Sequence, residues 1–81
     1  MRILDDDNDQ PRKSISIFLT TKEAAEFRDS LEALLQRGVG SHEHISSPDW
    51  SKEVTIALYE PDSAALANFS ERARRLIAED V

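Results

Sequence analysis

Two histidines are the first residues whose spacing could support chemistry. His42 and His44 are the only histidines in the chain, and they stand two residues apart. On a strand this spacing places both imidazoles on one face, which is a two-ligand arrangement for a metal ion such as zinc (Zn). A zinc site needs at least three protein ligands, so carboxylates such as Asp49 or Glu53, or the same pair from a second chain, would have to complete it. The alternative is that both histidines simply fill solvent-facing positions of a half-buried strand.

An acidic run near the N-terminus resembles a calcium loop only in its first positions. Asp5, Asp7 and Asp9 have the spacing that opens an EF-hand loop, but the sixth position is Gln10 where such a loop requires glycine. We therefore expect residues 1–13 to form an acidic, flexible N-terminal arm.

No group of residues combines the parts of a catalytic site. Serines and histidines occur together between Ser41 and Ser47, but nucleophilic catalysis also needs an orienting third group and an oxyanion hole in a pocket that excludes water. The acidic residues fall on predicted loops and solvent faces, where burial does not separate their pKa values for acid–base work. We therefore expect a protein that is not an enzyme.

Length and charge narrow the function classes further. The 81 residues allow one domain, and a net charge of −6 is the wrong sign for general nucleic-acid binding. The absence of cysteine fits a reducing compartment, and no segment approaches the ~20 apolar residues that span a bilayer. We expect a cytoplasmic protein with no membrane or nucleic-acid partner. Since so short a chain builds only a small core, pairing with a second chain would stabilise it.

Three segments have the alternating pattern of strands. These are residues 14–19, residues 42–46 and residues 54–59. The alternation gives them one apolar face, made of Ile15, Ile17, Leu19, Ile45, Val54, Ile56 and Leu58.

Two segments have the pattern of amphipathic helices. The first opens with a capping box from Thr20 to Glu23, and Gly38 supplies its C-terminal cap. Its apolar positions are Ala24, Phe27, Leu31, Leu34 and Leu35. The second helix opens at Asp62 or Ser63 and runs to Ile77, because apolar residues recur through it at helical spacing.

The order strand, helix, strand, strand, helix predicts the fold class. We expect residues 14–81 to form a single α+β domain, a two-layer sandwich in which a three-stranded, mostly antiparallel sheet carries both helices on one face. This βαββα arrangement is a ferredoxin-like unit without its last strand. An edge strand would remain unpaired, which favours a homodimer joined through the sheets.

The outward face of this sheet is the predicted contact surface. By alternation it carries two aromatic residues among its polar ones, and a tryptophan follows in the adjoining turn, where it could be an interface anchor or cap the core. The predicted partner-binding residues are Phe18, His42, His44, Trp50, Thr55 and Tyr59. The leading interpretation is a protein-binding module, and the alternative is a metal- or small-ligand-binding module that uses His42 and His44.

One stretch resembles a known group of proteins. Ile17 to Tyr59 holds a strand, an amphipathic helix with Leu34 and Leu35, the step His-Glu-His-Ile from His42, and a final strand. This order is similar to that of small bacterial immunity-like proteins of polymorphic toxin systems. The residues Thr20-Thr21 stand where that family has glycine before the helix. The resemblance implies a non-enzymatic protein that binds and blocks a toxin.

Overall fold

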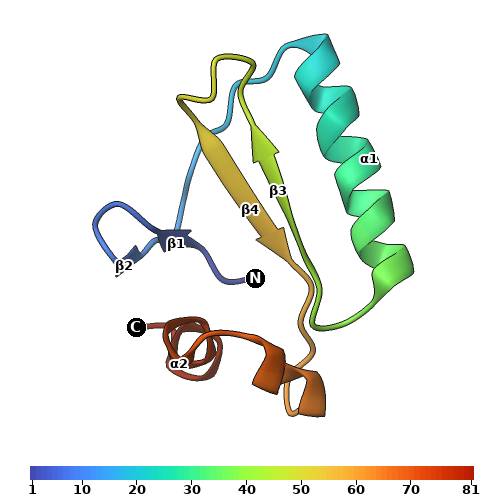
Figure 1. The fold of residues 1–81 in the computed structure, drawn as a ribbon. Coiled ribbons are helices and arrows are strands. Elements are labelled where there is room, and N and C mark those ends of the chain that lie inside the picture. Colours follow the sequence, from blue (N-terminus) through green and yellow to red (C-terminus); the bar gives the residue numbers. More distant parts are fainter.

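A computed structural model describes all 81 residues as a small α+β protein (Figure 1). In chain order the elements are β1 (Leu4–Asp5), β2 (Gln10–Pro11), α1 (Thr21–Arg37), β3 (His42–Ser46), β4 (Glu53–Ala57), the 3-10 helix η1 (Ala64–Asn68) and α2 (Glu71–Glu79). β1 pairs with β2 and β3 pairs with β4, both antiparallel.

The capping box fixes the start of α1, as predicted. The backbone N–H of Glu23 donates to Thr20 Oγ1 at 3.2 Å, and the backbone N–H of Thr20 donates to Glu23 Oε1 at 3.0 Å. These bonds satisfy two backbone donors that a helix end leaves free. The helix ends at Gly38, whose φ of 89° suits glycine because it has no Cβ. The predicted bounds of this helix are confirmed.

The β3–β4 hairpin forms the main packing surface for α1. Its register places Ile45 opposite Val54 and His44 opposite Thr55. Ile45 is buried, and so is Leu34 of α1, which packs against β3. At the C-terminal end of α1, an ion pair of 2.6 Å joins Arg37 Nη1 to Glu43 Oε1 of β3. The alternation predicted for residues 42–46 is therefore confirmed, and that predicted for residues 54–59 holds as far as Ala57, where β4 ends.

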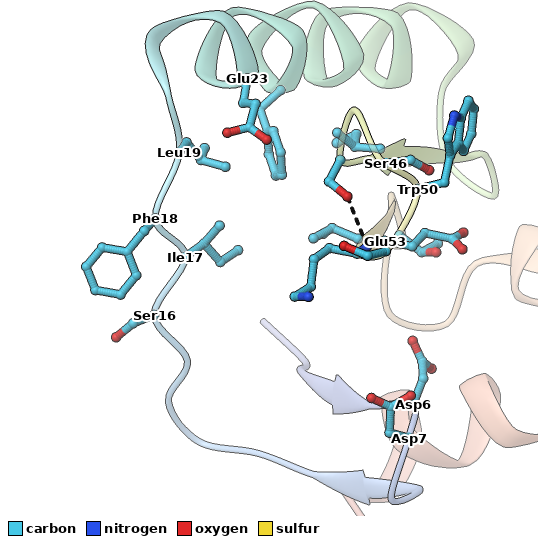
Figure 2. A pocket seen from close by; sticks show the side chains of 17 residues that line it. Asp6, Asp7, Ser16, Ile17, Phe18, Leu19, Glu23, Ser46, Trp50 and Glu53 are labelled. Atoms are coloured by element: carbon cyan, nitrogen blue, oxygen red, sulfur yellow. Dashed lines mark hydrogen bonds between the residues drawn. The ribbon is translucent and has the colours of Figure 1, made fainter.

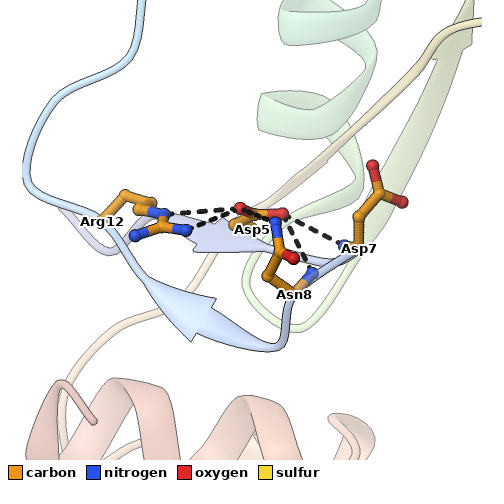
Figure 3. A network of polar contacts seen from close by, with 4 residues as sticks. All are labelled: Asp5, Asp7, Asn8 and Arg12. Carbon is orange, nitrogen blue, oxygen red and sulfur yellow. Dashed lines mark hydrogen bonds and ion pairs between the residues drawn. The ribbon is translucent and has the colours of Figure 1, made fainter.

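The N-terminal residues form a second small sheet. Between β1 and β2, the Asp5 carboxylate accepts hydrogen bonds from Asn8 Nδ2 at 2.9 Å and from the backbone N–H groups of Asp7 and Asn8 (Figure 3). Arg12 Nη2 lies 3.0 Å from the same carboxylate. The side-chain hydrogen bond from Asn8, followed by that from Arg12, lowers the pKa of Asp5 to about 2. The acidic run thus closes a turn through its own hydrogen bonds.

The C-terminal helix α2 lies against this N-terminal hairpin. Arg2 Nε donates to the carbonyl oxygen of Leu76 at 3.1 Å, and Arg72 Nε donates to Asp9 Oδ1 at 2.6 Å. Leu76 is the one buried residue of α2. The two chain ends therefore lie close together, away from α1 (Figure 1).

The predicted three-stranded sheet is wrong. The structure has two separate two-stranded sheets, and residues 14–19 belong to neither of them. The peptide groups of residues 14–19 make no hydrogen bond within the chain. The physical reason is that the segment is held at its two ends, by the bond from the Arg12 N–H to the Ile3 oxygen and by the capping box at Thr20, at a distance from β4. Contrary to the prediction, the two helices do not share one sheet face: α1 packs against β3, whereas α2 contacts Arg2 and Asp9 beside the N-terminal hairpin.

The predicted second helix is two helices. Phe69 ends η1 and Ser70 begins α2, because the Ser70 hydroxyl accepts a hydrogen bond from the Ala73 N–H at 3.1 Å. Ser63 caps η1 in the same way through the Ala65 N–H. Each serine offers the backbone a local acceptor that starts a new helix.

The chain keeps an unusually large surface. Its accessible area is 6282 Å² and only three residues are buried, Leu34, Ile45 and Leu76. A compact monomer of this mass exposes about 4,900 Å², so the chain exposes about 1,400 Å² more. Its radius of gyration of 13.3 Å likewise exceeds the ~11.7 Å expected for this length.

Candidate protein-binding surface

The exposed face of the β3–β4 hairpin holds three of the predicted contact residues together. His42, His44 and Thr55 all lie on the side of the hairpin opposite Ile45 and Val54, and all three are exposed. The two imidazole rings have centroids 5.0 Å apart and meet edge to face, at 82°. The prediction that both histidines project from one face is therefore confirmed.

His44 is tied to its neighbours across the hairpin. Its Nδ1 lies 2.7 Å from Glu53 Oε1 and 2.9 Å from Thr55 Oγ1. These contacts fix the orientation of the ring and leave Nε2 for other partners. The chain brings no three histidine, cysteine, aspartate or glutamate side chains together in an arrangement that could hold a metal ion. A metal site on this pair would therefore need ligands from a second chain.

The turn between β3 and β4 holds Trp50 out into solvent. Trp50 has a φ of 62° and keeps 82% of its surface exposed. A bulky residue in this left-handed region costs about 1–2 kcal/mol of conformational energy. Burial of the indole within the chain does not offset this cost. The side chain is instead kept available at the end of the hairpin.

Hydrogen bonds centred on Asp49 order this turn. Asp49 Oδ1 accepts from the Ser47 hydroxyl at 2.7 Å, from the Ser51 hydroxyl at 2.8 Å and from the Ser51 N–H at 3.1 Å. The Ser47 bond is the largest cause that lowers the pKa of Asp49, to about 2. The Trp50 N–H donates to the Ser47 oxygen at 2.9 Å. The tryptophan therefore stands on a well-bonded turn.

Phe18 and Tyr59 do not join the hairpin face. Phe18 lies in the unpaired segment and is 94% exposed, while Tyr59 follows β4 and is half-buried. The alternation of side chains within the segment is nevertheless present. Figure 2 shows Ile17 and Leu19 directed into the space beside the hairpin, and Ser16 and Phe18 directed away from it.

A groove of about 730 Å³ separates this segment from the hairpin. Ile17 and Leu19 form one wall (Figure 2), and Val54 and Thr55 of β4 also line the groove. Phe27 of α1 also lines it. Four carboxylates border the groove against one lysine; these residues are Asp6, Asp7, Glu23, Glu53 and Lys52.

The groove exposes the free backbone edge of β4. In an antiparallel pair, alternate residues direct both peptide groups to the neighbouring strand. The Ser47 N–H donates to the Lys52 oxygen and the Leu58 N–H donates to the Ser41 oxygen, so the even-numbered residues of β4 face β3. The peptide groups of Glu53, Thr55 and Ala57 consequently point to the other edge. This edge can accept another strand.

Sequence reasoning missed the groove and the Asp49 network. The turn residues from Ser47 to Ser51 carried a usable signal, because an aspartate flanked by serines favours side-chain to backbone bonds in turns. The groove had no such signal, since its walls come from segments that local patterns cannot place relative to one another.

None of the helices is both long enough and apolar enough to cross a lipid bilayer. In comparisons with known proteins, no family model, no curated protein and no solved structure matches this chain.

Proposed function

We propose that this chain is a small cytoplasmic, non-enzymatic protein-binding module that acts as an inhibitor, an immunity protein or a regulatory adaptor. The observation that carries the proposal is Trp50, which the chain holds 82% exposed in a strained conformation on a hydrogen-bonded turn. No burial of the indole offsets this strain, and strained residues of this kind cluster at functional sites. Tryptophan is also among the residues most enriched at the energetic centres of protein interfaces.

The hairpin face beside the turn supplies the polar surroundings that such an anchor needs. His44 and Thr55 are exposed and hydrogen-bonded to each other, so binding loses little of their side-chain entropy, and the exposed His42 lies beside them. Polar, solvent-accessible rims around an aromatic centre are typical of protein interfaces. The net charge of −6 favours a basic partner and a rate of association that falls with added salt.

Affinity capture with matched variants tests this proposal. The wild type, Trp50→Ala and Leu35→Ala proteins are immobilised, and the proteins that each retains from a lysate of source cells are quantified by mass spectrometry. Leu35 is a suitable control because it is apolar, 69% exposed and located on α1. We expect a partner retained by the wild type and by Leu35→Ala but lost with Trp50→Ala.

The recovered partner then allows a quantitative measurement. The affinities of the wild type and of Trp50→Ala for this partner are compared by titration calorimetry, because Trp50 is the only tryptophan and the variant has no emission of its own to follow. Removal of an anchor worth about 2 kcal/mol or more weakens binding at least about 30-fold. Equal affinity of Trp50→Ala and the wild type for the partner would refute the role of the turn.

A further inference from the structure

We propose that the groove beside β4 receives residues 14–19 of a second copy of this chain, which add a strand to the free edge of β4 in a reciprocal homodimer. The inference goes beyond the proposed function, because it concerns the edge of the hairpin and needs no foreign partner. The first observation that supports it is that both strands of such a contact have backbone groups without hydrogen-bond partners. The peptide groups of residues 14–19 make no hydrogen bond in the chain, and those of Glu53, Thr55 and Ala57 face away from β3.

The side chains of the segment suit this position. Residues 14–19 alternate polar and apolar, and Ile15, Ile17 and Leu19 remain 55%, 47% and 40% exposed. Addition of such a strand would place one row of apolar side chains over Phe27 and Val54, which line the groove.

The arrangement closes by symmetry. Across the interface the order would be β4 of one copy, the segment of the second, the segment of the first, and β4 of the second. The same surface is used by both copies, as a two-fold dimer requires. The free edge of β4 is then occupied in both copies, so this contact joins no more than two chains.

The available surface is large enough for a stable dimer. Each chain exposes about 1,400 Å² more than a compact monomer of its mass, whereas a standard interface buries about 800 Å² per partner. The surplus includes the apolar residues of the segment itself. A dimer of this kind would bring the exposed area per chain close to that of an ordinary globular protein.

The negative charges around the groove favour binding of the segment that follows Lys13 in the second copy. Lys13 immediately precedes it and makes no ion pair in the chain, while Arg12 is already held by Asp5. Carboxylates outnumber cations around the groove, with Glu53 on β4 itself. Lys13 of the second copy would therefore meet a negative surface, which offsets locally the repulsion between two chains of charge −6.

Sedimentation of the purified protein tests the proposal. We expect a dimer at about 100 μM, since interfaces of standard size give dissociation constants of about 1 μM or lower. Thr55→Pro removes an N–H that the hairpin does not use and blocks the edge, so it should weaken the dimer at least tenfold. Thr55→Val keeps that N–H and removes the hydroxyl, and it should leave the dimer unchanged. Circular dichroism checks that both variants retain the fold.

Reversal of the charge at Lys13 supplies a second test, which leaves the hairpin unchanged. Lys13→Glu should weaken the dimer at least fivefold at low salt, whereas Lys22→Glu, the same change on the exposed surface of α1, should not. A monomeric wild type at about 100 μM overturns the proposal. A dimer that both Thr55→Pro and Lys13→Glu leave intact also overturns it, because the copies then meet elsewhere. Either result leaves the capture experiment with Trp50 unaffected, since that experiment measures a foreign partner.

Discussion

Leu34 and Leu35 offer a direct test of how α1 packs. The two residues are neighbours of the same type on one helix, but Leu34 is 4% exposed and Leu35 is 69% exposed. Leu34→Ala removes one of only three buried side chains and should cost about 2–3 kcal/mol, the lower part of the usual range, because so open a core can collapse around the change. Leu35→Ala should change the free energy of unfolding by less than about 0.5 kcal/mol.

The free energy lost in Leu34→Ala is large relative to the total stability of the chain. A chain of 81 residues has a stability of about 4–12 kcal/mol, so Leu34→Ala removes about a sixth of it or more. With a urea dependence of about 1 kcal/mol per molar, the midpoint falls by about 2–3 M. Circular dichroism in the helical band is the suitable signal, because Trp50 is already exposed in the folded state and its fluorescence reports little on unfolding.

If Leu34→Ala is already unfolded without urea, a variant with a smaller expected loss of stability still gives a measurable midpoint. Ile45→Val, in the strand that faces Leu34, should cost about 0.5–1.5 kcal/mol. Equal midpoints for Leu34→Ala and Leu35→Ala would refute the reasoning, because α1 would then present neither leucine preferentially to the hairpin.

Three further predictions follow from local contacts. Thr20→Ala breaks the capping box of α1 and should lower the free energy of unfolding by about 1 kcal/mol in urea titrations; an unchanged midpoint would contradict the role of the cap. The pKa of Asp49, about 2 against an ordinary 3.8, means that this carboxylate stabilises the fold above pH 3.8 and that its contribution is lost as the pH falls through about 2. Ser47→Ala should raise that pKa toward 3.8 in a carboxyl NMR titration, and a value that stays near 2 argues against the Ser47 bond as its main cause. Gly40→Ala should destabilise the fold more than Gly38→Ala, although φ is near +90° at both positions. The reason is that a Cβ at Gly40 would lie 2.7 Å from an η1 side chain, whereas a Cβ at Gly38 would meet nothing within 4 Å. Equal urea midpoints for the two variants would show that the contact with η1 has no cost.

The elements that sequence reasoning located are those set by local interactions. The capping box at Thr20 acts within four residues, and the alternation from His42 to Ser46 acts within five, so each could be recognised without knowledge of the rest of the chain. The same locality explains why both histidines were placed correctly on one face.

The predictions were wrong where a sequence pattern does not determine which segment a strand or helix packs against. Alternation in residues 14–19 indicates the direction of side chains, and Ile17 and Leu19 do share a side, but it does not say which strand supplies the hydrogen bonds. In the C-terminal part, apolar spacing continued through Ser70, although its hydroxyl begins a new helix there. The positive φ of Trp50 had no signal at all, because tryptophan is not a residue that favours that region.

The joining of the two chain ends has a consequence for how the molecule opens. Arg2 reaches the Leu76 carbonyl and Arg72 reaches Asp9, so the N-terminal hairpin and α2 stabilise one another through contacts that span more than sixty positions of sequence. These contacts involve only exposed or partly buried groups, and Leu76 alone is buried beneath them. Such a unit should unfold locally before the hairpin of β3 and β4, and its amide protons should exchange with solvent together. A protease that cuts within residues 6–9 would then also remove the contacts that hold α2 in place. Cleavage at one end of the chain would therefore expose the other end to degradation.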